Sequence, residues 1–198
     1  LDHVQSQDVV TFTGSAHTGL LLKSNPRILA ENVPFTMEAD SLNCIVLGED
    51  VEPGMPEWDI FIKEVRREIT TKSGQRCTAV RRIFVPENKI EAVQQSITAA
   101  LAQNVIGNPL NPSVRMGSLA GESQRKEVRA QVEKLLTSSS ILYGSLDTVE
   151  VVDADPVKGA FISPLFLFKD NPFGNTVVHE VEAFGPVATL MPYQKTAD

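Results

Sequence analysis

The strongest constraint on the fold is an alternation of short apolar runs with amphipathic segments. Apolar runs typical of strands fall at residues 8–12, 34–37, 44–47, 79–85, 141–143, 161–168 and 187–190. Between several of them, apolar residues recur at the helical spacing of three and four, most clearly at 56–69, 87–101 and 122–136. Strands that alternate with helices predict an α/β fold, in which helices flank a mostly parallel sheet.

The clearest helix begins at Pro56. Proline suits the first position of a helix, and Gly74 suits the exit of the chain from it. Charged residues alternate with the apolar ones, which indicates one buried side and one wet side. We expect the buried side to be formed by Trp58, Ile60, Phe61, Ile62, Val65 and Ile69.

Composition excludes several classes of function. The 198 residues carry 18 Lys and Arg against 25 Asp and Glu, a net charge of −7, so binding to nucleic acid or to an anionic membrane is not expected. No run approaches the length of a membrane span. Cys44 and Cys77 form no CxxC pair, and the three histidines have no metal-ligand spacing. We therefore expect a cytoplasmic protein without a metal site.

A short turn after the first apolar run is the first candidate site. Thr13, Gly14 and Ser15 end a strand-like segment and open the helix predicted at 16–22. Backbone N–H groups at the start of a helix suit a phosphate, and Gly14 would let a pyrophosphate approach the chain. Gly19 would let the helix pack closely. An ordinary strand-to-helix turn explains the same residues, because the complete G-x-G-x-x-G motif is absent.

The second candidate is Cys77, in the sequence Ser-Gly-Gln-Arg-Cys-Thr. It follows the helix that begins at Pro56, and Lys72 and Arg76 lie near it in sequence. Cations near a thiol favour the thiolate, which is the nucleophilic form. A free cysteine is also commonly a buried structural residue. That structural interpretation suits Cys44, at the start of an apolar run, better than Cys77.

Two glutamates and a phenylalanine complete the candidates. Glu38 follows an apolar run, and the carboxyl ends of strands in α/β folds face the ligand, so it could serve as a general base. Glu182 precedes Phe184 and a Gly-Pro turn, where a carboxylate could bind a ribose and the ring could pack against a flat cofactor. A solvated loop glutamate and a capped turn before a core strand are the plainer alternatives.

In their order and spacing these motifs resemble the aldehyde dehydrogenase superfamily along essentially the whole chain. The markers are Phe-Thr-Gly-Ser at 12–15, a glutamate 39 residues before the cysteine of Gly-Gln-x-Cys-Thr (77 − 38 = 39), Met-Gly at 116–117 and Glu-Ala-Phe-Gly-Pro at 182–186. After Glu38 the family commonly has Leu-Gly-Gly-Lys, whereas this chain has Ala-Asp-Ser-Leu-Asn. That run is similar to the dehydrogenase half of the bifunctional ring-opening proteins of bacterial phenylacetate degradation.

The resemblance implies a role for each candidate. Cys77 is expected to attack an aldehyde as the thiolate, and Glu38 to activate the water that releases the acid. Glu182 and Phe184 are expected to hold the nicotinamide ribose and flank the ring. Thr13, Gly14 and Ser15 are expected near the pyrophosphate and nicotinamide end of the cofactor.

The resemblance also implies partners and domain limits. It implies NADP or NAD as cofactor, a CoA-linked semialdehyde as substrate and a homo-oligomeric parent protein. Residues 1–40 would be the C-terminal part of a dinucleotide-binding domain, and residues 41–198 a catalytic domain that is incomplete at its C-terminal end. The chain is then expected to be a fragment of a larger protein with the aldehyde dehydrogenase fold, and to be inactive alone.

Two other classes of function stay open. The chain could be a catalytically inert piece with a role in packing and assembly, although Cys77 and Glu38 are both intact. It could instead be a hydrolase or acyltransferase that uses Cys77 without a nicotinamide. The Glu-Ala-Phe-Gly-Pro motif disfavours the hydrolase, since such an enzyme needs no ribose ligand.

Overall fold

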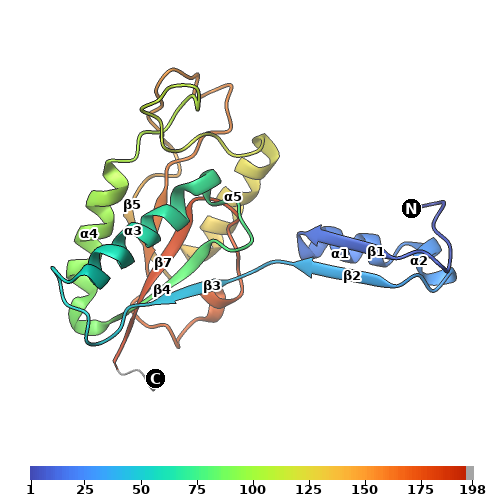
Figure 1. The fold of residues 1–198 in the computed structure, drawn as a ribbon, viewed down its shortest axis with the longest axis horizontal. Coiled ribbons are helices and arrows are strands. Elements are labelled where there is room, and N and C mark those ends of the chain that lie inside the picture. The colour runs from blue at the N-terminus through green and yellow to red at the C-terminus, as the bar shows by residue number, and fades with distance from the viewer. Residues whose placement is uncertain (195–198) are drawn as a thin grey trace. The chain divides into compact units, whose positions relative to one another are not determined.

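The computed structural model describes residues 1–194, and the chain divides into two compact units, Leu1–Ser41 and Leu42–Asp198 (Figure 1). The division lies one residue beyond the boundary expected from the sequence. No helix in the described part of the chain is long and apolar enough to cross a membrane.

The first unit is a small β-α-α-β motif. Strands β1 (Val10–Gly14) and β2 (Phe35–Ala39) pair in parallel, and they are joined by helices α1 (Ala16–Lys23) and α2 (Pro26–Ala30). Ser15 caps α1, because its side chain accepts a hydrogen bond from the Thr18 N–H. A Cβ atom on Gly19 would lie 2.2 Å from Sδ of Met37, which confirms that Gly19 lets α1 pack closely on β2.

The second unit is built on a five-stranded sheet in the order β3-β4-β7-β6-β5. Its strands are β3 (Asn43–Val46), β4 (Val80–Pro86), β5 (Ser140–Tyr143), β6 (Leu165–Phe168) and β7 (Val187–Tyr193). All neighbours pair in parallel except β5, which is antiparallel to β6. The predicted mostly parallel sheet with flanking helices is confirmed.

Helices cover both faces of this sheet (Figure 1). Helices α3 (Pro56–Thr70) and α4 (Ile90–Ala102) pack on one face, and α5 (Glu122–Leu135) packs on the other. Side chains of β6 and β7 alternate between the two cores: Phe166 and Leu190 join α3 and α4, whereas Leu165 and Met191 join α5. The alternation follows from the two-residue period of a strand that is buried on both faces.

Several details differ from the sequence-based expectations. Ile60 was expected on the buried side of α3 but is 59% exposed, because it lies on the opposite side of the helix from Phe61 and Val65. Cys44 was expected to be a buried structural residue but is exposed, because β3 is an edge strand. The apolar pair at 161–162 is buried without forming a strand.

Short helical turns account for the other differences. Helix α2 and the 3-10 turns Thr71–Gly74 and Thr176–His179 were not predicted, and the first residues of the helix predicted at 87–101 form a separate 3-10 turn, Glu87–Lys89. Each is only three to five residues long. A segment of that length is too short to show the helical spacing of apolar residues.

Candidate active site

The loop between α3 and β4 carries Cys77. The chain turns sharply there, because Lys72, Ser73 and Gly74 all have left-handed backbone angles, with φ of 52°, 52° and 68°. A further turn is closed by a hydrogen bond of 3.2 Å from the Ala79 N–H to the Arg76 carbonyl. Cys77 lies in this second turn, where it is exposed. The loop thus presents the thiol outward from a scaffold with tightly specified backbone geometry.

Side chains from this loop bind the segment around residues 117–120. The Ser73 hydroxyl lies 2.9 Å from the Gly117 carbonyl oxygen, and the Gln75 side-chain oxygen accepts a hydrogen bond of 2.8 Å from the Ala120 N–H. Left-handed geometry at a non-glycine residue costs free energy. The hydrogen bond of Ser73 helps to offset that cost. Ser73 and Gln75, on either side of Gly74, therefore anchor the cysteine loop to a distant segment.

Arg81 on β4 is the structural centre of the site. Its guanidinium donates to the Gly74 carbonyl at 2.8 Å and to the Gly185 carbonyl at 2.6 Å, and its Nε forms an ion pair of 3.2 Å with Glu182. The side chain is only 4% exposed. Burial lowers the pKa of Arg81 below its ordinary value, and the adjacent Glu182 carboxylate opposes that shift. Arg81 therefore joins the cysteine loop to the Glu-Ala-Phe-Gly-Pro segment.

The same arginine supports Phe184. The guanidinium carbon lies 5.6 Å from the centre of the Phe184 ring, a distance typical of a cation–π contact. Phe184 is nevertheless 40% exposed, so part of its ring is available to a ligand. Glu182 is 10% exposed and is held by Arg81 beside that ring.

Gly74 and Gly185 meet so closely that side chains would not fit. A Cβ atom on Gly74 would lie 2.1 Å from the Gly185 carbonyl oxygen, and one on Gly185 would lie 2.8 Å from a methyl group of Val128. The glycines of the two motifs thus serve a close approach of two backbone segments.

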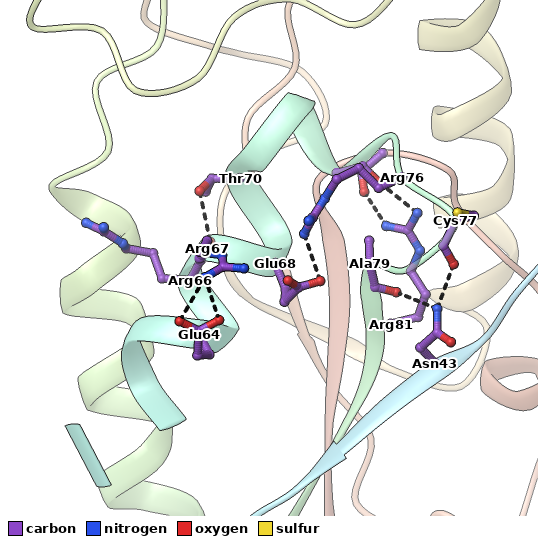
Figure 2. A network of polar contacts seen from close by, with 12 residues as sticks. Asn43, Glu64, Arg66, Arg67, Glu68, Thr70, Arg76, Cys77, Ala79 and Arg81 are labelled. Atoms are coloured by element: carbon purple, nitrogen blue, oxygen red, sulfur yellow. Dashed lines mark hydrogen bonds and ion pairs between the residues drawn. The ribbon is translucent and has the colours of Figure 1, made fainter. Parts of the chain in front are cut away.

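Arg76 was expected to be a cation close to the thiol of Cys77, but its charge is paired with a carboxylate of α3. Arg76 forms an ion pair of 2.7 Å with Glu68 of α3, and both side chains are largely buried (Figure 2). The charge of Arg76 is therefore compensated within the second unit. Its structural effect is to fix the start of the turn that carries Cys77.

The first unit gathers the other predicted site residues. Thr13 pairs with Glu38 across the parallel strands, and Gly14 pairs with Ala39. Both strands end at the same edge, where Thr13, Ser15 and Glu38 are exposed. The structure thus forms two groups, one in each unit: Thr13–Ser15 with Glu38, and Cys77 with Glu182 and Phe184.

Two backbone N–H groups at the start of α1 already donate hydrogen bonds to side chains of the protein. The carboxylate of Asp40 accepts a hydrogen bond of 3.1 Å from the Ala16 N–H, and the Ser15 hydroxyl accepts one of 3.2 Å from the Thr18 N–H. A phosphate at this helix start would have to compete with Asp40 for the N–H of Ala16. Asp40 belongs to the run that departs from the common family pattern.

Sequence reasoning missed two residues of the site: Arg81, and Asn43, whose side-chain amide donates to the carbonyls of Cys77 and Ala79. A signal for Arg81 was present, because two adjacent arginines interrupt the apolar run at 79–85, and a charge within a buried strand needs a partner. That partner, Glu182, lies 101 residues further along the chain. No group of His, Cys, Asp and Glu residues in the described part of the chain could hold a metal ion.

Comparisons with known proteins identify the family of the chain. The model of the aldehyde dehydrogenase family matches residues 2–198. A 3,4-dehydroadipyl-CoA semialdehyde dehydrogenase from Aromatoleum evansii is 41% identical over 198 residues, which are 100% of this chain and 38% of that relative. The chain therefore spans well under half the length of that curated relative.

Solved structures agree in fold. A betaine aldehyde dehydrogenase from Staphylococcus aureus, solved with NAD+, matches with a TM-score of 0.80 and 19% identity over 95% of this chain and 35% of that one. A succinic semialdehyde dehydrogenase from Streptococcus pyogenes, solved with NADP+, matches with a TM-score of 0.78 and 18% identity over 94% and 38%. The family model and the 41% identical relative establish membership. This chain belongs to the aldehyde dehydrogenase family.

Proposed function

We propose that this chain carries the nucleophile and the base of an NAD(P)-dependent dehydrogenase that oxidises a CoA-linked semialdehyde to the acid. The observation that carries the proposal is the arrangement around Arg81. That residue binds the Gly74 carbonyl of the cysteine loop and also binds Glu182 and the Gly185 carbonyl. A thiol for attack and a carboxylate with an aromatic ring for a cofactor thus share one scaffold.

The residues of the second unit suit the nicotinamide half of the cofactor. Glu182 offers a carboxylate, which is the acceptor that ribose hydroxyls need, and the partly exposed Phe184 offers a flat apolar surface beside it. In the first unit, Thr13 and Ser15 offer hydroxyl groups at the edge where β1 and β2 end. We therefore assign Glu182, Phe184 and residues 13–15 to cofactor binding. When bound, the nicotinamide supplies the acceptor for the hydrogen and electron pair that the oxidation removes.

Cys77 is the nucleophile in this proposal. Its thiolate attacks the aldehyde carbon and forms a thiohemiacetal, whose oxygen carries the negative charge that develops. The Cys77 N–H lies beside the new bond and can donate to that oxygen. Oxidation of the thiohemiacetal leaves an acyl group bound to Cys77 as a thioester.

Glu38 is the base that completes the cycle. Its carboxylate accepts a proton from a water molecule, and the water attacks the thioester carbon. The carbon–sulfur bond then breaks, which releases the acid and restores the thiolate of Cys77. Glu38 is exposed in its unit, as a residue that exchanges protons with water has to be.

The substrate class rests on the similar dehydrogenase from Aromatoleum evansii, whose name gives a CoA-linked semialdehyde as its substrate. The match to that relative, at 41% identity, covers the whole of this chain, so it also spans the run at 39–43 that departs from the common family pattern. We therefore propose the same substrate class here. Bacterial catabolism of an aromatic compound, with phenylacetate as the first candidate, is the corresponding biological setting.

The test compares two cysteine variants of the protein expressed from its complete reading frame. We expect the wild type to reduce NAD or NADP with a CoA-linked semialdehyde, and the ratio of the two rates identifies the preferred cofactor. Cys77→Ala should abolish reduction, whereas Cys44→Ala, which replaces the other exposed cysteine, should stay within about twofold of wild type. Cleavage of a thioester by Cys77 without any reduction of either cofactor would instead support a hydrolase.

A third variant tests the base. With Glu38→Gln we expect the first turnover to proceed and the acyl group to remain on Cys77, because the second half of the cycle lacks its proton acceptor. Mass spectrometry of the quenched protein would show the added acyl mass. Steady-state rates near those of wild type would remove Glu38 from the mechanism.

A further inference from the structure

Asn43, at the start of β3, contacts the loop that carries Cys77. Its side-chain Nδ2 donates to the Cys77 carbonyl at 2.7 Å and to the Ala79 carbonyl at 3.3 Å (Figure 2). Both partners are acceptors, so only the nitrogen of the amide can face them. The pairing of β3 with β4 shifts register between Asn43 and Cys44. Such a bulge re-aims the neighbouring side chain, and here it accompanies the contact of Asn43 with the loop.

The carbonyl that Asn43 holds belongs to the central peptide of a turn. Cys77 and Thr78 are the two central residues of the turn closed between Arg76 and Ala79. The two common turn types differ by a flip of this central peptide. The flipped form requires a positive φ at the third residue, which a β-branched threonine disfavours. The amide of Asn43 adds a second restraint against the flip.

The orientation of the Cys77–Thr78 peptide decides where the N–H of Thr78 points. Among residues 1–194, neither the N–H of Cys77 nor that of Thr78 donates a hydrogen bond. The C=O and N–H of a trans peptide point in opposite directions. By holding the Cys77 carbonyl, Asn43 therefore also fixes the direction of the Thr78 N–H.

We propose that Asn43 is a positioning residue, which holds the Cys77–Thr78 peptide so that the thiol and the unbonded N–H groups of the turn serve the same carbonyl group of the substrate. The inference rests on the proposed function of Cys77. Asn43 acts through the peptide, so its loss misplaces the nucleophile without removing it. Displacement of a reacting group by about 1 Å costs on the order of 100-fold in rate.

Three variants of the protein expressed from its complete reading frame test this role. Asn43→Asp has the same shape but replaces the donor with an oxygen, which repels both carbonyls. Asn43→Gln keeps the amide on a longer side chain. Asn108→Asp is the matched control: it introduces the same charge in the same unit, and its side-chain oxygen still accepts from the Leu110 N–H.

Three readouts separate positioning from a general loss of structure. They are the kcat and KM for the CoA-linked semialdehyde, the rate of Cys77 alkylation by iodoacetamide, and the midpoint of thermal unfolding from circular dichroism. Trypsin cuts after Arg76 and Arg81, so the Cys77 peptide is resolved from the peptide that contains Cys44.

For Asn43→Asp we expect a fall in kcat of about 10–100-fold, a KM within about threefold of wild type and a changed rate of Cys77 alkylation. Asn43→Gln should recover part of kcat, and the kcat of Asn43→Asp should stay low at temperatures well below its unfolding midpoint, where Asn108→Asp keeps full kcat. A kcat for Asn43→Asp within twofold of wild type would overturn the inference, as would a loss of kcat that follows the unfolding midpoint across all variants. Absence of any cofactor reduction by the wild type would overturn the proposed function itself.

Discussion

The first unit buries three of its residues, Gly19, Ile28 and Val33, whereas β6 and β7 of the second unit consist almost entirely of buried residues. The first unit has a single pair of strands and two short helices, a size that is marginal for independent stability. The second unit has helices on both faces of its sheet. The proposed nucleophile and the proposed base thus lie on scaffolds of very different stability.

The difference suits the two proposed tasks. Cys77 needs one fixed geometry for attack, and the second unit supplies it through Arg81, Asn43 and the close contact of two glycines. Glu38 has to take up a proton from water and release it again, which needs exposure more than rigidity. A small, exposed motif is adequate for that role.

The largest effect is expected from Gly74→Ala, which tests the rigidity of the second unit. The added methyl group would meet the Gly185 carbonyl at 2.1 Å, and neither backbone can yield without displacing Arg81. We expect a loss of about 4 kcal/mol or more in the free energy of unfolding. Urea denaturation followed by Trp58 fluorescence measures it, because the single tryptophan lies in the second unit.

Two further glycines calibrate that result. A Cβ atom on Gly117 or on Gly54 would lie within 4 Å of no other atom, but the backbone of Gly54 has a φ of +93°. We expect almost no cost for Gly117→Ala and about 1–2 kcal/mol for Gly54→Ala. A cost for Gly74→Ala no larger than that for Gly54→Ala would show that the close approach contributes nothing.

Arg81→Met should have the next largest effect. It deprives the buried carbonyls of Gly74 and Gly185 of their charged donor, at an expected cost of about 3–5 kcal/mol. Arg67→Met is the matched control, because the ion pair of Arg67 with Glu64 is on the surface and contributes about 0–1 kcal/mol. Equal unfolding midpoints for the two variants would contradict the role of Arg81 as the link between the two motifs.

Gly19→Ala extends the comparison to the first unit. The new methyl group would lie 2.2 Å from Sδ of Met37, so that flexible side chain has to move, at a cost of about 1–3 kcal/mol. We expect faster amide hydrogen exchange within residues 1–41. The urea unfolding transition of the second unit, followed by Trp58 fluorescence, should not change. Adding Met37→Ala should restore part of the loss. A Trp58 transition that shifts with Gly19→Ala would show that the two units unfold together.

The smallest effect concerns Tyr193, whose hydroxyl donates to the Leu47 carbonyl in the second unit. Burial, with a smaller effect of Glu49 and Asp50, raises the pKa of Tyr193 above its ordinary value. The folded state therefore holds this proton more tightly than the unfolded state, and its contribution to stability is complete below about pH 10 and is lost as the pH rises further.

Tyr193→Phe should therefore flatten the decline of stability above pH 10, and it should cost about 0.5–1.5 kcal/mol at pH 8. Trp58 unfolding midpoints in urea at a series of pH values measure both effects. Tyr143→Phe is the control, because burial also raises the pKa of Tyr143 but no carboxylate adds to that shift. An identical alkaline decline in wild type and Tyr193→Phe would contradict the assignment.

Local patterns in the sequence predicted most of the fold. The starts of α3 and α5 agree with the expected residues, because Pro56 and the charged turn at Glu122 mark them and apolar residues then recur at helical spacing. The exposure of Cys44 could not be predicted, since it depends on β3 being an edge strand. The order of strands in a sheet has no local signature.

The candidate site was predictable only in part. Cys77, Glu38, Glu182 and Phe184 were selected by motif spacing together with a family resemblance, and their roles stay predictions. The bond from Arg81 to Gly185 joins residues 104 positions apart in the sequence, so no pattern of neighbouring residues indicates it.

The order of strands also has a consequence for biosynthesis. Among residues 1–194, the strand β7 is the last in sequence, but it lies between β4 and β6 in the sheet. On the ribosome, β4 and β6 therefore wait with unpaired edges until residues 187–193 emerge. Unpaired edges of apolar strands are the sites at which nascent chains associate wrongly, so delayed completion of the sheet is the step at which chaperone assistance would matter most.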